Sequence, residues 1–516
     1  MYEGFLPAAP ILVVLIGAVI SLGFEGLVPR LVRSTLQAAW TALVFLAALG
    51  WTVVLWTQGR ASLAAGGLLA LDGPTVLSWA VLLIFSLMAC LLFSERRLSG
   101  GDSIFAASAS APPGSLAERE AIAARQEHSE VFVLLSFSVA GMMMFVASTD
   151  LLMMFVALEI FSFPLYILAG MARRRRLLSQ ESSLKYFLLG ALSSALFLYG
   201  IALTYGYAGG FSFAQIDNAI VNNLESEWLL LAGMSLMVVG VLFKLGAVPF
   251  HSWVPDVYTG APTVVTAFMA VCTKIAAAVG LLRLLYAALG SLRWDWQIAV
   301  AVIAVATMIV GAVVGLQQRD VKRLMAYSSI AHAGFILVAL VGAFTYESGL
   351  MLGGVGSIEA VVLYLLAYGF ATMGAFAIIS MVRRNGTEVS SYDAWLGIGR
   401  RHPWVGIAMT VFVLSMAGIP LTGGFIGKVV AFIAGWQGGY SWLVFIAIIA
   451  SLITAGFYFR VIYLTFASGR NDDVEVIRPG IGTVSVIWIA LIATILMGVY
   501  PAPVMELLAA AAGFVR

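Results

Sequence analysis

The sequence predicts an all-α integral membrane protein, and three observations carry that prediction. Of the 516 residues, 62% are hydrophobic and only 10% are charged, whereas soluble domains carry about 25% charged residues. Apolar stretches long enough to cross a bilayer follow one another along the whole chain. The basic residues are also sorted, because arginine falls mostly between these stretches and four of the five lysines fall inside them. These observations exclude a soluble enzyme.

A helix that crosses a bilayer needs about 20 apolar residues, and the chain offers fourteen such stretches. The longer ones must tilt, kink or extend past the bilayer. The predicted spans are residues 5–25, 35–57, 75–93, 131–149, 151–172, 182–206, 228–249, 263–287, 296–316, 324–345, 353–382, 403–434, 440–466 and 480–512.

A polar stretch separates the third and fourth spans. It contains Pro112, Pro113 and several serines and alanines, a composition typical of a loop, and it is too short for a domain. The predicted organisation is an N-terminal three-helix segment, a polar loop on the cytoplasmic side, two five-helix repeats and a C-terminal helix. In that order the segments are 1–93, 94–130, 131–290, 291–470 and 471–516.

The arginines predict the orientation, because cytoplasmic loops of membrane proteins carry an excess of basic residues. With the N-terminus outside, the inner loops receive the run Arg173–Arg176 and Arg383, among others. The outer side keeps little more than Arg60, Arg293 and Arg516. An even number of spans returns the C-terminus to the outside. One missed helix would scramble this sorting, so it supports fourteen spans independently.

The chain also repeats itself at an offset of about 170 residues. Gly246-Ala-Val-Pro249 in the seventh span aligns with Ala417-Gly-Ile-Pro420 in the twelfth. Phe155–Glu159 in the fifth span aligns with Met325–Ser329 in the tenth. Each repeat would hold five helices, so the second must be inverted relative to the first. Inverted repeats with broken helices are an architecture of transporters, although Gly-Pro pairs also recur by chance in apolar sequence.

Composition also excludes several kinds of site. Only two cysteines exist, Cys90 and Cys272, whereas an iron–sulfur cluster needs about four cysteine ligands. The four histidines show no paired spacing for haem or zinc, and no nucleotide-binding motif occurs. A net charge of +2 is too small and dispersed for nucleic-acid binding. We therefore expect no cofactor and no metal on this chain.

Charged residues inside the spans predict the functional site. Glu159, Lys244, Lys274 and Lys428 each lie within an apolar stretch, where a charge costs at least about 2.5–3.5 kcal/mol. Lys185 begins its span near the inner face, where a lysine can extend to the interface and have only a structural role. The same structural role stays open, as an alternative, for the other lysines.

Lysine suits proton transfer where arginine does not. Arginine stays protonated in essentially any site, whereas a desolvated lysine loses its proton readily and a nearby carboxylate reverses that tendency. We expect Glu159 and Lys244 to form such a proton switch. His251 and His332 titrate in a range that could extend the path, although a structural hydrogen bond is an equally available role. We expect the fifth lysine, Lys322, in a basic inner loop, where it acts as an arginine would.

At this point the sequence resembles a known family. The segments VLFKLGAVPFHSWVPDVYTGAP, from Val241 to Pro262, and GLQQRDVKRLMAYSSIAHAGF are similar to the signature of the antiporter-like subunits of respiratory complex I. The resemblance covers about residues 131–466, and more loosely the whole length. Lysine at position 428, and the lack of a long amphipathic helix after the fourteenth span, favour the N-type members of that family.

The resemblance implies a function and roles for the residues. Glu159 and Lys244 would form the switch, Lys274 the central relay and Lys428 the outward gate. His251 and His332 would lie on a polar axis, with Lys185 on the uptake side. The chain would be a proton-translocating subunit of NADH:quinone oxidoreductase, an enzyme of the bacterial plasma membrane.

The resemblance also implies the partners. FMN, iron–sulfur clusters and quinone would be bound by partner subunits, and other membrane and peripheral subunits, including neighbouring antiporter-like subunits, would surround this chain. Two features depart from the family. The 94–130 loop is longer than expected, and position 329 is Ser where repeat symmetry would place a second Glu.

Three alternatives remain. A subunit of a multisubunit cation/proton antiporter would share the fold and the charged axis. A transporter of an organic solute would need a discriminating polar pocket, whereas the sequence shows a chain of ionisable residues. A purely structural membrane subunit would not need four charges in mid-membrane.

Overall fold

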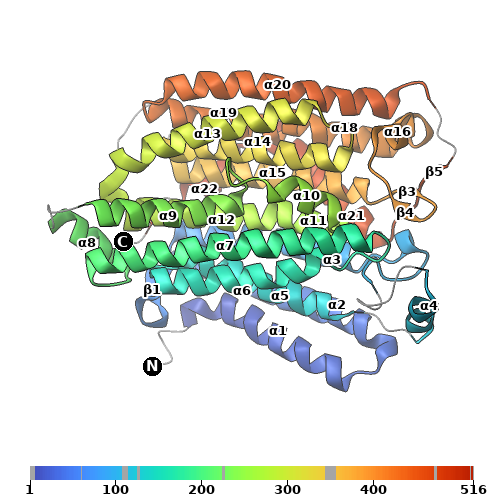
Figure 1. The fold of residues 1–516 in the computed structure, drawn as a ribbon, viewed down its shortest axis with the longest axis horizontal. Coiled ribbons are helices and arrows are strands. Elements are labelled where there is room, and N and C mark those ends of the chain that lie inside the picture. The colour runs from blue at the N-terminus through green and yellow to red at the C-terminus, as the bar shows by residue number, and fades with distance from the viewer. Residues whose placement is uncertain are drawn as a thin grey trace.

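The structure is a computed structural model that describes residues 6–59, 61–106, 114–124, 128–222, 227–342, 356–469, 473–511 and 513–514. The predicted features at Arg60, Pro112, Pro113 and Arg516 lie outside the described residues. Figure 1 shows long helices lying side by side in one bundle, with short strands and short helices at its two ends.

The described helices and strands follow the predicted order. The helices are α1 (Ala9–Leu27), α2 (Arg30–Gln58), α3 (Gly73–Phe93), α4 (Leu116–Ala123), α5 (Glu130–Ala147), α6 (Leu151–Ala169), α7 (Arg176–Ala208), α8 (Phe213–Asn222), α9 (Trp228–Leu245), α10 (Trp253–Gly260), α11 (Thr263–Phe268), α12 (Lys274–Arg283), α13 (Arg293–Leu316), α14 (Val321–Val341), α15 (Ser357–Ile379), α16 (Tyr392–Trp395), α17 (Ile398–Arg401), α18 (Pro403–Ala417), α19 (Gly423–Gln437), α20 (Ser441–Phe466), α21 (Ile481–Val499) and α22 (Ala502–Ala509). The strands are β1 (Ser62–Ala64), β2 (Leu69–Leu71), β3 (Val382–Arg384), β4 (Thr387–Glu388) and β5 (Val474–Val476).

The number of membrane passes agrees with the prediction. Thirteen helical spans within the described residues are long and apolar enough to cross a bilayer. One of them is α11 joined to α12 by the π-helical turn Met269–Thr273. The remaining pass consists of α18 and α19, each 15 residues long and so too short to cross alone. The prediction of an all-α membrane protein with about fourteen passes is confirmed.

Burial divides the helices into a centre and a rim. The α11–α12 span is completely buried, and 94% of the most apolar stretch of α14 and of α15 is buried. By contrast, α2, α7 and α21 expose large apolar side chains such as Leu31, Leu184 and Ile492. A bilayer accepts that outer apolar surface, whereas polar groups must be satisfied inside the bundle. Charged side chains on the central helices are therefore kept away from lipid.

The two ends of the bundle differ. The α8 helix and the β1–β2 hairpin lie at one end, and α4 and the sheet β4–β3–β5 lie at the other (Figure 1). At that second end the loop after α3 packs on the connection between α6 and α7. Phe105 forms a β-bridge with Ala172, and the Ala106 amide donates to the Met171 carbonyl at 2.9 Å. The predicted mobile 94–130 loop thus includes a docked segment and the helix α4.

Two sequence-based predictions about elements are wrong. The last span, 480–512, is two helices, because α21 ends at Val499 and Pro501 precedes α22; proline interrupts helix hydrogen bonding. Lys322 is not a loop residue. It is the second residue of α14, with 1% of its surface exposed, because the loops at this end of the bundle cover it.

Candidate functional site

Two helices break in the same way, one in each repeat. The α9 helix ends at Leu245 and α18 ends at Ala417, and each is followed by a glycine with positive φ, Gly246 at 78° and Gly418 at 84°. In both, the glycine amide and the next amide donate back to carbonyls of the last helical turn at 3.0–3.1 Å. This is the Schellman helix ending, which requires a left-handed residue. The structure therefore aligns Gly246 with Gly418, one residue further on than the sequence alignment.

A lysine lies at each break. The ammonium of Lys274 donates to the Leu245 carbonyl at 2.6 Å, and that of Lys428 donates to the Ala417 carbonyl at 2.9 Å. Both carbonyls belong to the residue just before the left-handed glycine. The two lysines come from different places, α12 and the second half of the broken pair α18–α19. Because the C-terminal end of a helix carries partial negative charge, each break stabilises a buried cation.

Lys244 lies in an aromatic cage on α9, just before the first break. It is 1% exposed, and its ammonium donates to the Tyr166 hydroxyl at 3.0 Å. The rings of Phe161, Tyr186 and Phe243 lie 5.3–5.7 Å from the ammonium, with Tyr166 at 4.9 Å. Such ring faces attract a cation. The site therefore accepts Lys244 in its charged form without a counter-ion in contact.

Glu159 lies near Lys244 but does not bond to it. Its carboxylate is close enough to act on the charge of Lys244, yet among the described residues no ion pair joins the two within 4.0 Å. The Oε1 atom of Glu159 is buried without a hydrogen-bond partner in that part of the chain. The expected pair is thus separated, and Tyr166 is the direct partner of Lys244.

His332 is held between two tyrosines. Its Nδ1 lies 2.6 Å from the Tyr364 hydroxyl and its Nε2 lies 3.0 Å from the Tyr458 hydroxyl, which also contacts Ser328. A cavity with an empty volume of about 210 Å³ adjoins the histidine. It is lined by His332, Tyr364, Ala367, Tyr368, Ala371, Ser415, Met416, Gly424 and Gly427. Because the α18 break and α19 supply part of this lining, the cavity links His332 to the region of Lys428, and its polar groups can bind water.

The other two predicted residues lie nearer the ends of the helices. Lys185 is 44% exposed and forms ion pairs with Glu181 at 2.7 Å and Asp256 at 2.9 Å. Its contacts fit a surface ion pair as well as a proton-uptake residue. His251 lies in the connection from α9 to α10, half-buried, with no partner for Nδ1 among the described residues.

Sequence reasoning missed several polar residues. Tyr166, Tyr364 and Tyr458 read as ordinary aromatic residues, because nothing local shows that their hydroxyls meet charged groups far away in the chain. Arg283 was missed for another reason, since arginine had been assigned to the loops. Its guanidinium is fully buried and pairs with Asp72 at 2.7 Å. Its place inside the predicted span 263–287 was the available signal.

Ser329 and Lys322 complete the polar set. Ser329, at the position aligned with Glu159, lies 3.4 Å from the Tyr258 hydroxyl. Lys322 donates to the Ala261 carbonyl at 2.6 Å and lies 4.0 Å from Glu388. The second repeat therefore has hydroxyl groups where the first has a carboxylate.

The fold and this site define a class of protein: a multi-pass membrane protein with two broken helices and buried ionisable residues at the breaks. A family model described as NADH:quinone oxidoreductase/Mrp antiporter, TM, matches residues 148–454. The chain is 52% identical over 513 residues to NADH-quinone oxidoreductase subunit N of Cutibacterium acnes, covering 99% of this chain and 95% of that protein. It is 48% identical over 520 residues to subunit N of a Nocardioides species, with 98% and 97% covered. The chain belongs to the NADH-quinone oxidoreductase subunit N family.

Solved structures agree with this assignment. A chain of respiratory complex I from Thermus thermophilus superimposes with a TM-score of 0.77 at 29% identity, covering 98% of this chain and 100% of that one. A chain of the Mrp complex from Dietzia superimposes with a TM-score of 0.78 at 19% identity, with 98% and 97% covered. The second likeness shows a shared fold alone. The resemblance inferred from the sequence is confirmed, and subunit N is favoured over the antiporter alternative.

Proposed function

We propose that this chain is a proton-translocating membrane subunit of a bacterial respiratory complex I. NADH oxidation and quinone reduction in partner subunits would supply the energy, and this chain would transfer protons along its buried Glu, Lys, His and Tyr residues. The observation that carries the proposal is the pair of equivalent helix breaks, each with a buried lysine bonded to its last carbonyl. Subunit N relatives that align over nearly the whole chain support the same function.

The geometry suggests how a lysine changes its proton affinity. Burial disfavours the ammonium, whereas the helix-end carbonyl favours it. Lys274 and Lys428 therefore lie where opposing effects nearly balance, and a small change in a neighbouring charge decides whether the proton stays. Moving one proton against 100 mV requires about 2.3 kcal/mol. A change of charge at Lys244 or Glu159 is of a kind that can drive such a step.

We place FMN, the iron–sulfur clusters and quinone on partner subunits, since Cys90 and Cys272 are the only cysteines and are too few to ligate a cluster. Other membrane and peripheral subunits, including neighbouring antiporter-like subunits, would complete the assembly. We also propose the bacterial plasma membrane as the location, with both termini outside. The arginine-rich connections around Arg174 and Arg383 line one pocket and so lie at one end of the bundle, as cytoplasmic loops do.

The test compares proton pumping with electron transfer in membrane vesicles. Lys244→Ala and Glu159→Gln should assemble and reduce quinone but pump fewer protons per NADH oxidised. Tyr199→Phe, on the exposed surface of α7, is the matched control and should pump normally. Normal pumping by the Lys244→Ala/Glu159→Gln double variant would refute the assignment.

Co-purification separates the proposal from its alternative. A complex I subunit should purify with flavin and iron–sulfur proteins. A chain that purified only with antiporter subunits would instead support the cation/proton antiporter.

A further inference from the structure

A second polar site lies at the end of the bundle away from α8. It is a pocket with an empty volume of about 420 Å³. Its lining comes from four connections: those after α3, between α6 and α7, between α10 and α11, and the β3–β4 hairpin. The lining residues are Ser99, Ile104, Ala172, Arg173, Arg174, Arg175, Gly260, Ala261, Pro262, Arg383, Thr387 and Glu388. The proton-transfer residues described above are not among them.

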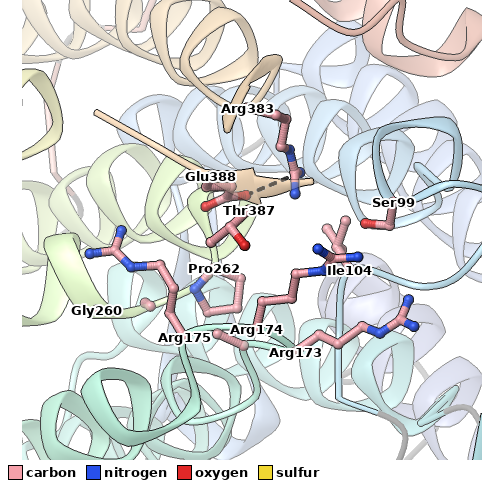
Figure 2. A pocket seen from close by; sticks show the side chains of 12 residues that line it. Ser99, Ile104, Arg173, Arg174, Arg175, Gly260, Pro262, Arg383, Thr387 and Glu388 are labelled. Carbon is pink, nitrogen blue, oxygen red and sulfur yellow. Dashed lines mark hydrogen bonds and ion pairs between the residues drawn. The ribbon is translucent and has the colours of Figure 1, made fainter. Parts of the chain in front are cut away.

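The pocket carries a large excess of positive charge. Four of its lining residues are arginines, and Glu388 is the one acid among the residues that line it. Figure 2 shows three arginine side chains spreading from one segment, with Arg383 and Glu388 on the facing wall. Lys322 adds a further cation beside Glu388, at 4.0 Å.

The acidic groups nearby are already paired. Glu388 accepts from the Thr263 hydroxyl at 2.6 Å and lies 3.4 Å from the Arg383 guanidinium. Asp102, from the loop after α3, pairs with Arg173 at 2.9 Å. Burial alone would raise the pKa of Glu388, but the cations around it outweigh burial and lower the pKa. Glu388 is therefore a carboxylate that neutralises one of the cations and leaves the others in excess.

Two arginines lack an acidic partner. The Arg174 guanidinium donates at 2.8 Å to a neutral group, the Asn385 carbonyl. The Arg175 side chain forms no hydrogen bond or ion pair with any residue that the structure describes, and it is partly buried at the start of α7. Helix starts also carry unpaired amides and partial positive charge. An unoccupied arrangement of this kind repels itself, and an anion would relieve that repulsion.

The walls hold the arginines in place. Gly386, at the β3–β4 turn, has φ of 72°, and a Cβ there would lie 2.7 Å from Nη1 of Arg174. The bridge between Phe105 and Ala172 fixes the backbone just before Arg173. The docked part of the 94–130 loop thus has a structural consequence, because it closes one side of the pocket.

We propose that this pocket binds a phosphate group, supplied by the headgroup of an anionic phospholipid or by a free phosphate anion. Arginine is suited to phosphate because its planar guanidinium can donate two parallel hydrogen bonds. A lipid source fits the surroundings, since Leu177, two residues after Arg175, is 83% exposed and Leu184 further along α7 is 57% exposed. These apolar side chains could accept acyl chains beside a headgroup held by Arg174 and Arg175. The site goes beyond proton transfer and does not depend on it.

The test measures binding of phosphatidylglycerol to the detergent-purified complex after removal of native lipid. Each basic residue near a membrane surface contributes about 1 kcal/mol to attraction of anionic lipid, which corresponds to about fivefold in affinity. Arg175→Gln should therefore bind about fivefold more weakly, and Arg174→Gln/Arg175→Gln about 25-fold more weakly. Arg119→Gln, on the exposed face of α4, removes one charge outside the pocket and should bind like the wild type.

A competition arm distinguishes the two sources. Excess inorganic phosphate that displaces the lipid from the wild type, but has no effect in the double variant, would identify a free-anion site. Phosphate that fails to displace it would identify a lipid site. Wild-type affinity in the double variant, or equal losses in Arg119→Gln, would overturn the proposal. If the double variant does not assemble, Arg175→Gln alone carries the test. Proton pumping is not the readout, so failure here leaves the proposed function standing.

Discussion

At the scale of single residues, the hydroxyl of Tyr166 is the group that sequence reasoning could not foresee. It accepts the Lys244 ammonium, and a hydrogen bond to a charged group contributes about 1.5–3 kcal/mol. Tyr166→Phe keeps the ring, and therefore the cation–π contact, but removes that bond. We expect proton transfer through this chain to slow about tenfold or more, with assembly unchanged. Vesicle pumping measures it, and unchanged pumping would show that Lys244 does not act through Tyr166.

A second residue-scale prediction concerns Arg283, which we interpret as structural. Its guanidinium binds Asp72, the Val146 carbonyl at 2.7 Å and the Thr75 hydroxyl at 2.5 Å. Removing one partner of a buried ion pair costs about 3–5 kcal/mol. Arg283→Met should therefore lower assembly and thermal stability. Adding Asp72→Asn should recover part of the loss, because asparagine is uncharged and still caps α3. No recovery would mean that packing, rather than charge, dominates at this position.

At the scale of elements, the breaks in α9 and α18 are predictable in kind but not in register. Gly-Pro patterns near buried lysines indicate broken helices, and the structure has them. Pro420 marks its break two residues late, however, because the left-handed glycine, and not the proline, ends the helix. Nor does sequence show that Lys274 bonds to the first break, since the bond joins residues on different helices. Tertiary contacts of that kind have no local signature.

The second break supports an element-scale prediction. Gly418 has φ of 84°, and a Cβ there would lie 2.8 Å from Cδ of Lys428. Gly418→Ala should therefore combine backbone strain of about 1–2 kcal/mol with a displaced Lys428, and pumping should fall. Gly439→Ala is the control, because Gly439 has φ of 88° with nothing near its Cβ position. It should show the strain without the pumping defect. Equal defects in both variants would assign the effect to strain alone.

At the scale of the whole molecule, the sequence predicts the membrane passes well and the ends of the bundle poorly. Apolar length and arginine sorting follow from lipid and are local properties, so they can be counted. Lys322 shows the limit. Its neighbours Asp320 and Arg323 look like a solvated loop, yet three connections from distant parts of the chain close over it. Burial there results from the assembly of β3 and β4 against α11 and α14, and composition does not record it.

That assembly yields a prediction about pH. Glu388 is held by Thr263, Lys322 and Arg383 and so joins three connections at one end of the bundle. Its pKa is lowered in the folded chain, against about 4.3 when unfolded. The carboxylate therefore contributes stability that is fully present above pH of about 4.3 and is lost as pH falls through the lower folded pKa. Glu388→Gln should be less stable at neutral pH and should lose less stability on acidification. Thermal unfolding of the reconstituted complex between neutral and acidic pH measures both effects. A variant with the same acid sensitivity as the wild type would show that other carboxylates control this end of the molecule.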